Sequence, residues 1–128
     1  MANETPLLTF AIPTFNRPGS LSKLLAILLE QLQEETRVEL IVSDNASPDE
    51  TADVVSRYQA SGLPIRYLRN HTNLGADRNI LNCFEQSTGK YVWIFSDDDV
   101  IAPGTLDRVL RVLSSHVYDL VCIRAYFF

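Results

Sequence analysis

Three consecutive carboxylates are the residues of this chain best suited to chemistry: Asp97, Asp98 and Asp99 directly follow an apolar, aromatic run and one serine, 91–96. Carboxylates this close together repel one another and raise each other's pKa unless a positive charge lies among them. A divalent cation supplies that charge, because Mg²⁺ typically takes one or two protein carboxylates and fills its other positions with water and phosphate oxygens. The triplet therefore indicates a metal site that could clamp a diphosphate and neutralise a leaving nucleotide. A solvated Asp-rich turn that caps the next helix is the alternative.

Four other side chains have both a binding and a structural interpretation. Asp44 ends an apolar run and could accept a hydrogen bond from a ribose or a base, or form an Asx-turn with the backbone of Ala46. Phe15 could stack on a base or fold back into the core, and Arg17 could approach a phosphate or lie in solvent. Arg78 follows an aspartate on a predicted helix, where an exposed polar face is the simpler account. Residue type alone leaves these alternatives open.

Apolar runs typical of strands alternate along the chain with segments whose apolar residues have helical spacing. The predicted strands are 7–12, 38–44, 64–70, 91–95 and 118–128, and the predicted helices are 21–33, 47–61, 75–89 and 103–116. Alternating strands and helices with nearly continuous apolar strands predict an α/β fold. We expect a three-layer, Rossmann-like, mainly parallel sheet with helices on both faces. Ligands bind such sheets beyond the carboxyl ends of the strands, where many of the polar residues lie.

The start of the second predicted helix has the features of a capping box. Ser47 can cap the helix, Pro48 suits the first helical position, and Glu50 completes the box with Ser47. We therefore expect this helix to begin directly after Ser47 and to end at Gly62.

Composition and charge narrow the class of protein. The chain has 128 residues, which fits one domain, and its net charge of −5 comes from 16 Asp+Glu against 11 Lys+Arg. This acidic balance argues against a nucleic-acid binder, which normally carries a basic stripe. No apolar run approaches the roughly 18 residues of a membrane span, and the N-terminus does not have the pattern of a signal peptide. Cys83 and Cys122 have no metal-ligand spacing, so we expect two buried free thiols and a reducing, cytoplasmic location.

Several common motifs of α/β enzymes are missing. The sequence has no G-x-G-x-x-G after its first predicted strand, no G-x-x-x-x-G-K-[ST] and no G-x-S-x-G. These absences count against a dinucleotide-dependent dehydrogenase, a P-loop NTPase and an enzyme with a serine nucleophile elbow.

Four segments together resemble glycosyltransferase family 2, whose fold is GT-A. They are FAIPTFNRPGSLSKLLAILLEQ, ELIVSDNASPDETADVV, IRYLRNHTNLGADRN and GKYVWIFSDDDVIAPGTLDRVL. The match covers nearly the whole chain in the family's order and at its intervals, and the combination is specific where no single piece is. The SDNASPDET and SDDD forms are most similar to the abequosyltransferase-like branch, which transfers deoxysugars during bacterial surface-polysaccharide assembly.

The resemblance implies a nucleotide site at the strand ends. Phe15 would lie against the base, Asp44 would hydrogen-bond the base, and Asp97 would face the ribose. Other residues implied at the nucleotide are Pro13, Thr14, Arg17, Arg78 and, in the family's N-x-G loop, Asn73 and Gly75. The segment that follows this loop is two residues shorter than the family's common form, which bears on the role of Arg78.

The resemblance also implies a divalent cation, Mn²⁺ or Mg²⁺. Asp98 would be the main ligand from the family's D-x-D element, with Asp99 beside it. If the chain is aligned on Pro103, Ser96 stands at the usual first position of that element. Asp97 to Asp99 also form a D-x-D, so the two alignments differ in register by one residue.

The implied activity is inverting transfer of a sugar from a nucleoside-diphosphate sugar to a hydroxyl of a glycan or lipid-linked glycan. The family's domain normally continues with an acceptor-binding half that supplies the general base. We therefore expect residues 1–128 to be the N-terminal nucleotide-sugar-binding part, truncated at the C-terminus, with the base beyond Phe128. The chain alone is expected to bind nucleotide at most. We expect the parent enzyme at the inner face of the membrane, and the last strand to be an exposed apolar edge that favours self-association.

Two other functions stay open on the sequence. A nucleotidyltransferase would share the layout and the metal, but it usually has a Gly-rich, basic loop after its first strand, whereas PTFNRPGS supplies one Gly and one Arg. A non-catalytic domain that keeps the fold for partner binding is the other alternative. Nucleotide affinity that does not depend on metal, or no affinity, would favour that last alternative.

Overall fold

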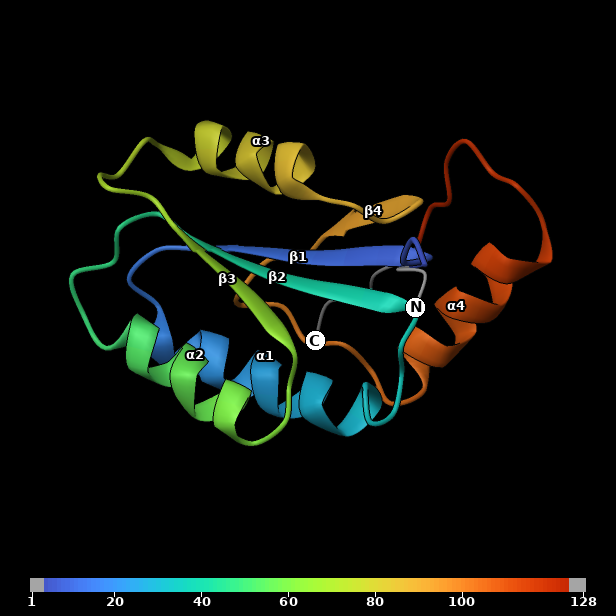
Figure 1. Cartoon of the computed structure of the whole chain (residues 1–128), viewed down its shortest axis with the longest axis horizontal. Helices are drawn as coiled ribbons and strands as arrows, with labels where there is room; N and C mark the ends of the chain where they lie inside the picture. The colour runs from blue at the N-terminus through green and yellow to red at the C-terminus, as the bar shows by residue number, and fades with distance from the viewer. Residues whose placement is uncertain (1–3, 125–128) are drawn as a thin grey trace.

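The computed structural model describes residues 4–124 and contains one parallel sheet (Figure 1). Its strands are β1 (Leu8–Thr14), β2 (Val38–Asp44), β3 (Ile65–Arg69) and β4 (Tyr91–Ile94), in the order β3-β2-β1-β4. All three neighbouring pairs are parallel, and the register places Thr14 opposite Asp44 and Asp44 opposite Arg69. The carboxyl ends of β1, β2 and β3 therefore meet at one edge of the sheet.

Helices cover both faces of the sheet, as predicted. They are α1 (Pro18–Gln31), α2 (Thr51–Ala60), α3 (Ala76–Gln86) and α4 (Thr105–Ser115). Figure 1 shows α3 on one face and α1 and α2 on the other, with α4 near the start of β1. Within residues 4–124, no helix is long and apolar enough to cross a bilayer. The predicted three-layer α/β fold is confirmed.

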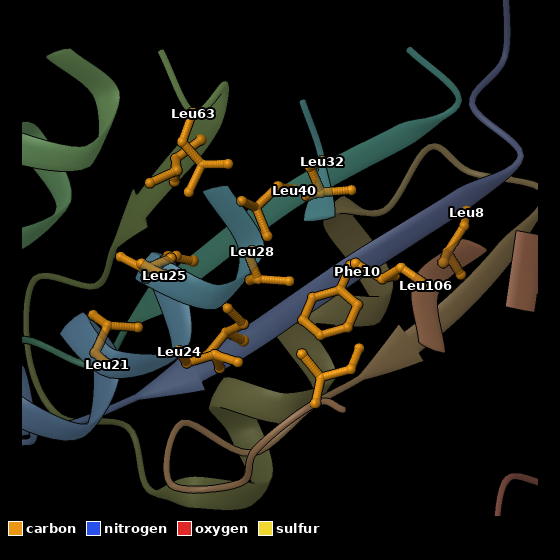
Figure 2. Close-up of a cluster of buried hydrophobic side chains, with 14 of the residues drawn as sticks. Leu8, Phe10, Leu21, Leu24, Leu25, Leu28, Leu32, Leu40, Leu63 and Leu106 are labelled. Carbon is orange, nitrogen blue, oxygen red and sulfur yellow. The ribbon is translucent and has the colours of Figure 1, made fainter. Parts of the chain in front are cut away.

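The two faces of the sheet bury cores of different size. Alternate residues of β1 point to opposite faces, so Phe10 joins a large cluster with α1 whereas Ala11 joins a small cluster with α3. Figure 2 shows the large cluster, which includes Phe10, Leu24 and Leu28. The buried residues of the small cluster are Ala11, Ile41 and Cys83. The face that packs against α1, α2 and α4 therefore contains most of the buried apolar side chains.

Helix α2 begins at Thr51 rather than directly after Ser47. The hydroxyl of Ser47 donates a hydrogen bond to Asp44 Oδ1, and its oxygen accepts one from the N–H of Asn16. Asp49 Oδ1 instead accepts the N–H of Thr51 (3.0 Å) at the start of the helix. The capping-box prediction is wrong because the Ser47 oxygen, which would have to accept an N–H to cap the helix, accepts the N–H of Asn16 while its proton is held by Asp44.

The segment after α4 is not a strand over the residues that the structure describes. Residues 118–124 belong to no sheet, and the N–H of Tyr118 donates to the hydroxyl of Tyr91 (2.9 Å). Leu120 and Cys122 are exposed. The strand prediction is therefore wrong for 118–124, and the rest of the predicted strand lies outside the described residues. The prediction of a buried Cys122 is also wrong, because an apolar run is buried as a strand only where a sheet edge pairs with it.

The turn between α3 and β4 packs directly against β1. The N–H of Gly89 donates to Thr9 Oγ1 (2.8 Å), and the hydroxyl of Thr9 donates to Glu39 Oε1 (2.9 Å) on β2. Thr88 donates to the Glu39 carboxylate from its N–H and its hydroxyl, both at 2.9 Å. A Cβ atom at Gly89 would lie 2.5 Å from Thr9 N, so a larger residue does not fit this turn without a shift of the backbone.

Candidate functional site

A pocket of about 400 Å³ lies at the carboxyl ends of the strands, within the size range of small-molecule sites. Its walls come from the end of β1, the loop after β2, the start of α3 and the segment after β4. Seven residues that we predicted at a nucleotide line it: Pro13, Thr14, Phe15, Arg17, Asn73, Gly75 and Asp97. Asp44 and Arg78 are not among the lining residues, and neither are the predicted metal ligands Asp98 and Asp99.

The end of β1 forms one wall of the pocket. Thr14 is buried, and its hydroxyl donates to Asp97 Oδ2 (2.8 Å). Asn16 has a positive φ of 56°, which turns the chain toward α1. Phe15 is 40% exposed and lines the pocket, so it does not fold back into the core. Its ring is therefore available to stack on a flat ligand.

Arg17 bridges two of the three carboxylates. Its Nη1 lies 3.2 Å from Asp97 Oδ1 and 3.2 Å from Asp98 Oδ2. Asp97 is 5% exposed, whereas the side chain of Asp98 is 53% exposed and accepts a hydrogen bond from the hydroxyl of Ser96. That hydrogen bond and the charge of Arg17 hold the pKa of Asp98 below its ordinary value. The positive charge that the triplet requires is thus supplied, in this structure, by Arg17.

Replacing Ser96 by alanine should raise the pKa of Asp98 toward its ordinary value, because the Ser96 hydrogen bond is the largest cause of the lowering. A depressed carboxyl pKa stabilises the folded state above the unfolded pKa, and that contribution is lost as the pH falls through the folded pKa. NMR titration of the Asp98 carboxyl carbon would measure the shift. Arg17→Gln should produce a smaller upward shift, since the charge of Arg17 is a lesser cause. An equal Asp98 pKa in wild type and Ser96→Ala would contradict this account.

Asp98 and Asp99 have donor atoms that suit a divalent cation. Both residues are exposed, and carboxylate oxygens are the hard ligands that Mg²⁺ and Mn²⁺ prefer. Among residues 4–124, no group of three or more His, Cys, Asp or Glu side chains is arranged to hold a metal. A cation here would complete its coordination with water or with phosphate oxygens of a ligand, as Mg²⁺ commonly does. The donor set therefore fits a site shared with a ligand.

Asp44 is fully buried. Its Oδ1 accepts hydrogen bonds from the N–H (2.9 Å) and the hydroxyl (2.6 Å) of Ser47, and its Oδ2 accepts one from the hydroxyl of Tyr67. Arg69 Nε lies 3.9 Å from Oδ2. Burial and the hydrogen bond to Asp44 raise the pKa of Tyr67. The carboxylate thus fixes the loop after β2, and its backbone contact goes to Ser47 and not to Ala46.

A cluster of amide side chains, buried at Asn45 and Asn79 and half-buried at Asn70, lies at the ends of β2 and β3, and we did not predict it. The Ser43 hydroxyl donates to Asn79 Oδ1 (2.7 Å), and Asn79 Nδ2 donates to the backbone oxygen of Ser43 (2.9 Å). Asn70 Nδ2 donates to Asn45 Oδ1 (2.9 Å) and to Asn79 Oδ1 (3.2 Å). Asn45 and Asn79 also line the pocket. The signal in the sequence was an asparagine at or just after the end of each of two predicted strands.

Residues 9–128 match the sequence profile of glycosyl transferase family 2. The chain belongs to this family. The match includes every element that lines the pocket, and it confirms the family that the four sequence segments indicated.

Curated family 2 relatives are similar over most of this chain. Abequosyltransferase RfbV of Salmonella typhimurium is 37% identical over 119 residues, which are 92% of this chain and 36% of the relative. A Campylobacter jejuni protein, GalNAc(5)-diNAcBac-PP-undecaprenol beta-1,3-glucosyltransferase, is 36% identical over 107 residues, which are 83% of this chain and 34% of that protein. The chain therefore spans about a third of the length of these relatives.

Solved glycosyltransferase structures share the fold. The crystal structure of Staphylococcus aureus TarS residues 1–349 in complex with UDP superposes with a TM-score of 0.77 at 26% identity, over 85% of this chain and 32% of that TarS fragment. A mannosyltransferase from Pyrobaculum calidifontis, solved with GDP-Man and Mn²⁺, has a TM-score of 0.75 at 24% identity over 88% of this chain and 33% of its own. The predicted GT-A type of α/β fold is confirmed.

Proposed function

We propose that this chain is the nucleotide-sugar-binding part of an inverting glycosyltransferase. The reaction would transfer a sugar from a nucleoside-diphosphate sugar to an acceptor hydroxyl in polysaccharide or surface-glycan biosynthesis. The observation that carries the proposal is the pocket, which is lined both by the exposed ring of Phe15 and by the ion pair of Asp97 with Arg17. Membership of family 2 supports it, as do the complexes of the similar S. aureus TarS with UDP and with UDP-GlcNAc.

The wall formed by β1 would hold the nucleoside. Phe15 offers an exposed ring for stacking on the base. Asp97 is held in place by Thr14 and Arg17, and its side-chain oxygens can accept hydrogen bonds from ribose hydroxyls. Asn73 and Gly75 line the pocket from the loop before α3 and would lie beside the nucleotide.

Two residues would have to change their contacts to meet the nucleotide. Asp44 can hydrogen-bond the base only if one of its contacts with Ser47 or Tyr67 opens, because the carboxylate is buried. Arg78 lies on the exposed side of α3, outside the pocket, and would have to bend toward a phosphate. Both assignments stay predictions.

Arg17, Asp98 and Asp99 would hold the diphosphate end of the donor. A bound Mn²⁺ or Mg²⁺ would neutralise the charge of the leaving nucleoside diphosphate. Asp98 would be the main ligand, with Asp99 beside it. The guanidinium of Arg17 contacts Asp98 at the surface and could exchange that carboxylate for a phosphate, since Arg binds both in the same planar geometry.

The acceptor would be a glycan or a lipid-linked glycan. Its hydroxyl would attack the anomeric carbon while its proton passes to a general base. We assign that base to no residue of this chain, since Asp97, the carboxylate that lines the pocket, is already held by Thr14 and Arg17. The chain alone would bind the donor without transferring the sugar. A position at the inner face of the membrane and self-association stay predictions.

Calorimetric titration of the chain with UDP, GDP, CDP and dTDP, each with and without Mn²⁺, tests this proposal. We expect one nucleotide to bind, and to bind much more tightly with the metal than without it. The Kd in Mn²⁺ should lie in the range of about 1 μM to 1 mM that is usual for the KM of enzyme substrates. Binding that does not depend on metal would favour a non-catalytic binding domain. If no nucleotide binds, the same titration on a longer protein that contains this chain shows whether the pocket was incomplete.

A further inference from the structure

The loop before α3 forms a wall of the pocket but has little apolar support. Asn73, Leu74 and Gly75 belong to no strand or helix, and all three are exposed. Gly75 has a positive φ of 87°, a conformation that favours glycine. Because the loop has so little buried apolar surface, polar contacts must determine where it lies.

Asn45 supplies most of these polar contacts. Its Nδ2 donates to Asn73 Oδ1 (2.7 Å) and to the backbone oxygen of Gly75 (3.2 Å). Its Oδ1 accepts the N–H of Leu74 (2.9 Å) and the amide of Asn70 (2.9 Å). An asparagine side chain has two donors and two acceptor positions, so its capacity is fully used. Three of these four contacts go to the loop.

Asn45 also connects the loop to the opposite wall. Its backbone N–H donates to the backbone oxygen of Thr14 (3.0 Å), at the end of β1 and next to Phe15. The residue is 3% exposed and lines the pocket between these two walls. The position of the loop relative to Phe15 therefore depends on this one side chain.

We propose that Asn45 is a positioning residue that sets the distance between the two walls of the nucleotide pocket and thereby determines nucleotide affinity. This inference rests on the proposed nucleotide-binding function. The inference also requires an amide, and not a carboxylate, at residue 45. Aspartate would keep the acceptors for Leu74 and Asn70 but would place a charge against the backbone oxygen of Gly75, which now accepts a hydrogen bond.

The first test measures how firmly the loop is held, without any ligand. Backbone amide hydrogen exchange, followed by NMR on the full chain, would compare wild type with Asn45→Ala, Asn45→Asp and Asn82→Ala. Asn82→Ala is the matched control, because Asn82 donates only to Asn70 Oδ1 (3.1 Å) and does not line the pocket. We expect exchange at Leu74 to rise about tenfold or more in Asn45→Ala, because its acceptor is removed. Exchange of the backbone amide of Phe10, which lies in the core, should not change in any variant.

The second test measures nucleotide affinity in the same variants. With the nucleotide that the wild type binds best, we expect Kd to rise about tenfold or more in Asn45→Ala and in Asn45→Asp, and less than about twofold in Asn82→Ala. The ratio of Kd without Mn²⁺ to Kd with Mn²⁺ should stay as in wild type, because Asp98 is untouched. Asn45→Asp has nearly the shape of asparagine, so it provides a folded variant if the alanine variant does not fold.

Three results would overturn the inference. These are unchanged Leu74 exchange in Asn45→Ala, unchanged affinity despite faster exchange, or an equal effect of Asn82→Ala. A wild-type chain that binds no nucleotide would instead count against the proposed function. The exchange measurement would then still decide whether Asn45 anchors the loop.

Discussion

Replacing Asp98 by alanine should abolish the metal-dependent part of nucleotide binding. The variant loses the carboxylate that we assign as main metal ligand, while Asp97 keeps its contacts with Thr14 and Arg17, so the nucleoside wall stays in place. We expect Kd in Mn²⁺ to rise by about 100-fold or more, since changes in a metal's outer-shell partners alone cost about 10- to 100-fold. Without Mn²⁺, wild type and variant should bind equally weakly. Calorimetry in the two conditions measures both values.

Two further variants make this result specific. Asp107→Ala removes the same charge from α4, where Asp107 pairs with Arg111 and does not line the pocket, and it should leave the affinity unchanged. Asp99→Ala tests the register of the D-x-D element. If Asp99→Ala abolishes metal dependence and Asp98→Ala does not, the main ligand has been assigned one residue too early. Metal-dependent binding that survives in both would refute the metal site.

Replacing Gly89 by alanine should destabilise the fold strongly. The added Cβ would lie 2.5 Å from Thr9 N, 2.6 Å from Thr9 Oγ1 and 2.9 Å from the carbonyl carbon of Leu8. Two of these atoms belong to the backbone of β1, so relief requires a shift of the turn away from the sheet. Overpacking of this kind typically costs about 1–3 kcal/mol, and we expect a value near 3 kcal/mol because the obstacle is backbone. Urea denaturation followed by circular dichroism measures the free energy of unfolding.

Gly19→Ala is the matched control for this prediction. Gly19 lies in α1, and a Cβ added there would meet nothing within 4 Å. Alanine is favoured over glycine inside a helix by roughly 0.5–1 kcal/mol, so this variant should be neutral or slightly stabilised. A Gly89→Ala protein as stable as Gly19→Ala would show that the turn into β4 is not packed against β1.

Local patterns in the sequence were sufficient for the four strands of the sheet and for much of the pocket, although they also predicted a strand over 118–124 that is absent. Strand β2 was predicted with its observed bounds, because an apolar run that ends in polar residues is typical of a strand inside a parallel sheet. Phe15 and Asp97 were expected at the site because they follow strands, and the carboxyl ends of parallel strands share one edge.

The remaining features depend on contacts between residues far apart in the sequence. Asp44 was predicted to hydrogen-bond a base or to form an Asx-turn, and nothing in the sequence indicated its contact with Tyr67, a residue on a different strand. The hydroxyl of Ser47 was assigned to a helix cap, but it accepts the N–H of Asn16 and donates to Asp44. The role of Asn45 depends on a loop almost 30 residues later, with which it shares no local pattern. The folded arrangement, and not the spacing along the chain, decides which polar groups form hydrogen bonds with one another.

The two ends of the pocket should respond differently to the solution around them. The contacts of Asn45 join neutral amides, which do not titrate and are not screened by salt. Arg17 and Asp98 are charged and partly exposed, so added salt and acid both weaken their hold on an ionic ligand. Overall affinity should therefore fall as ionic strength rises, while the ratio of affinities for different bases stays constant. Changes in salt or pH should thus reduce how much nucleotide is bound before they change which nucleotide is bound.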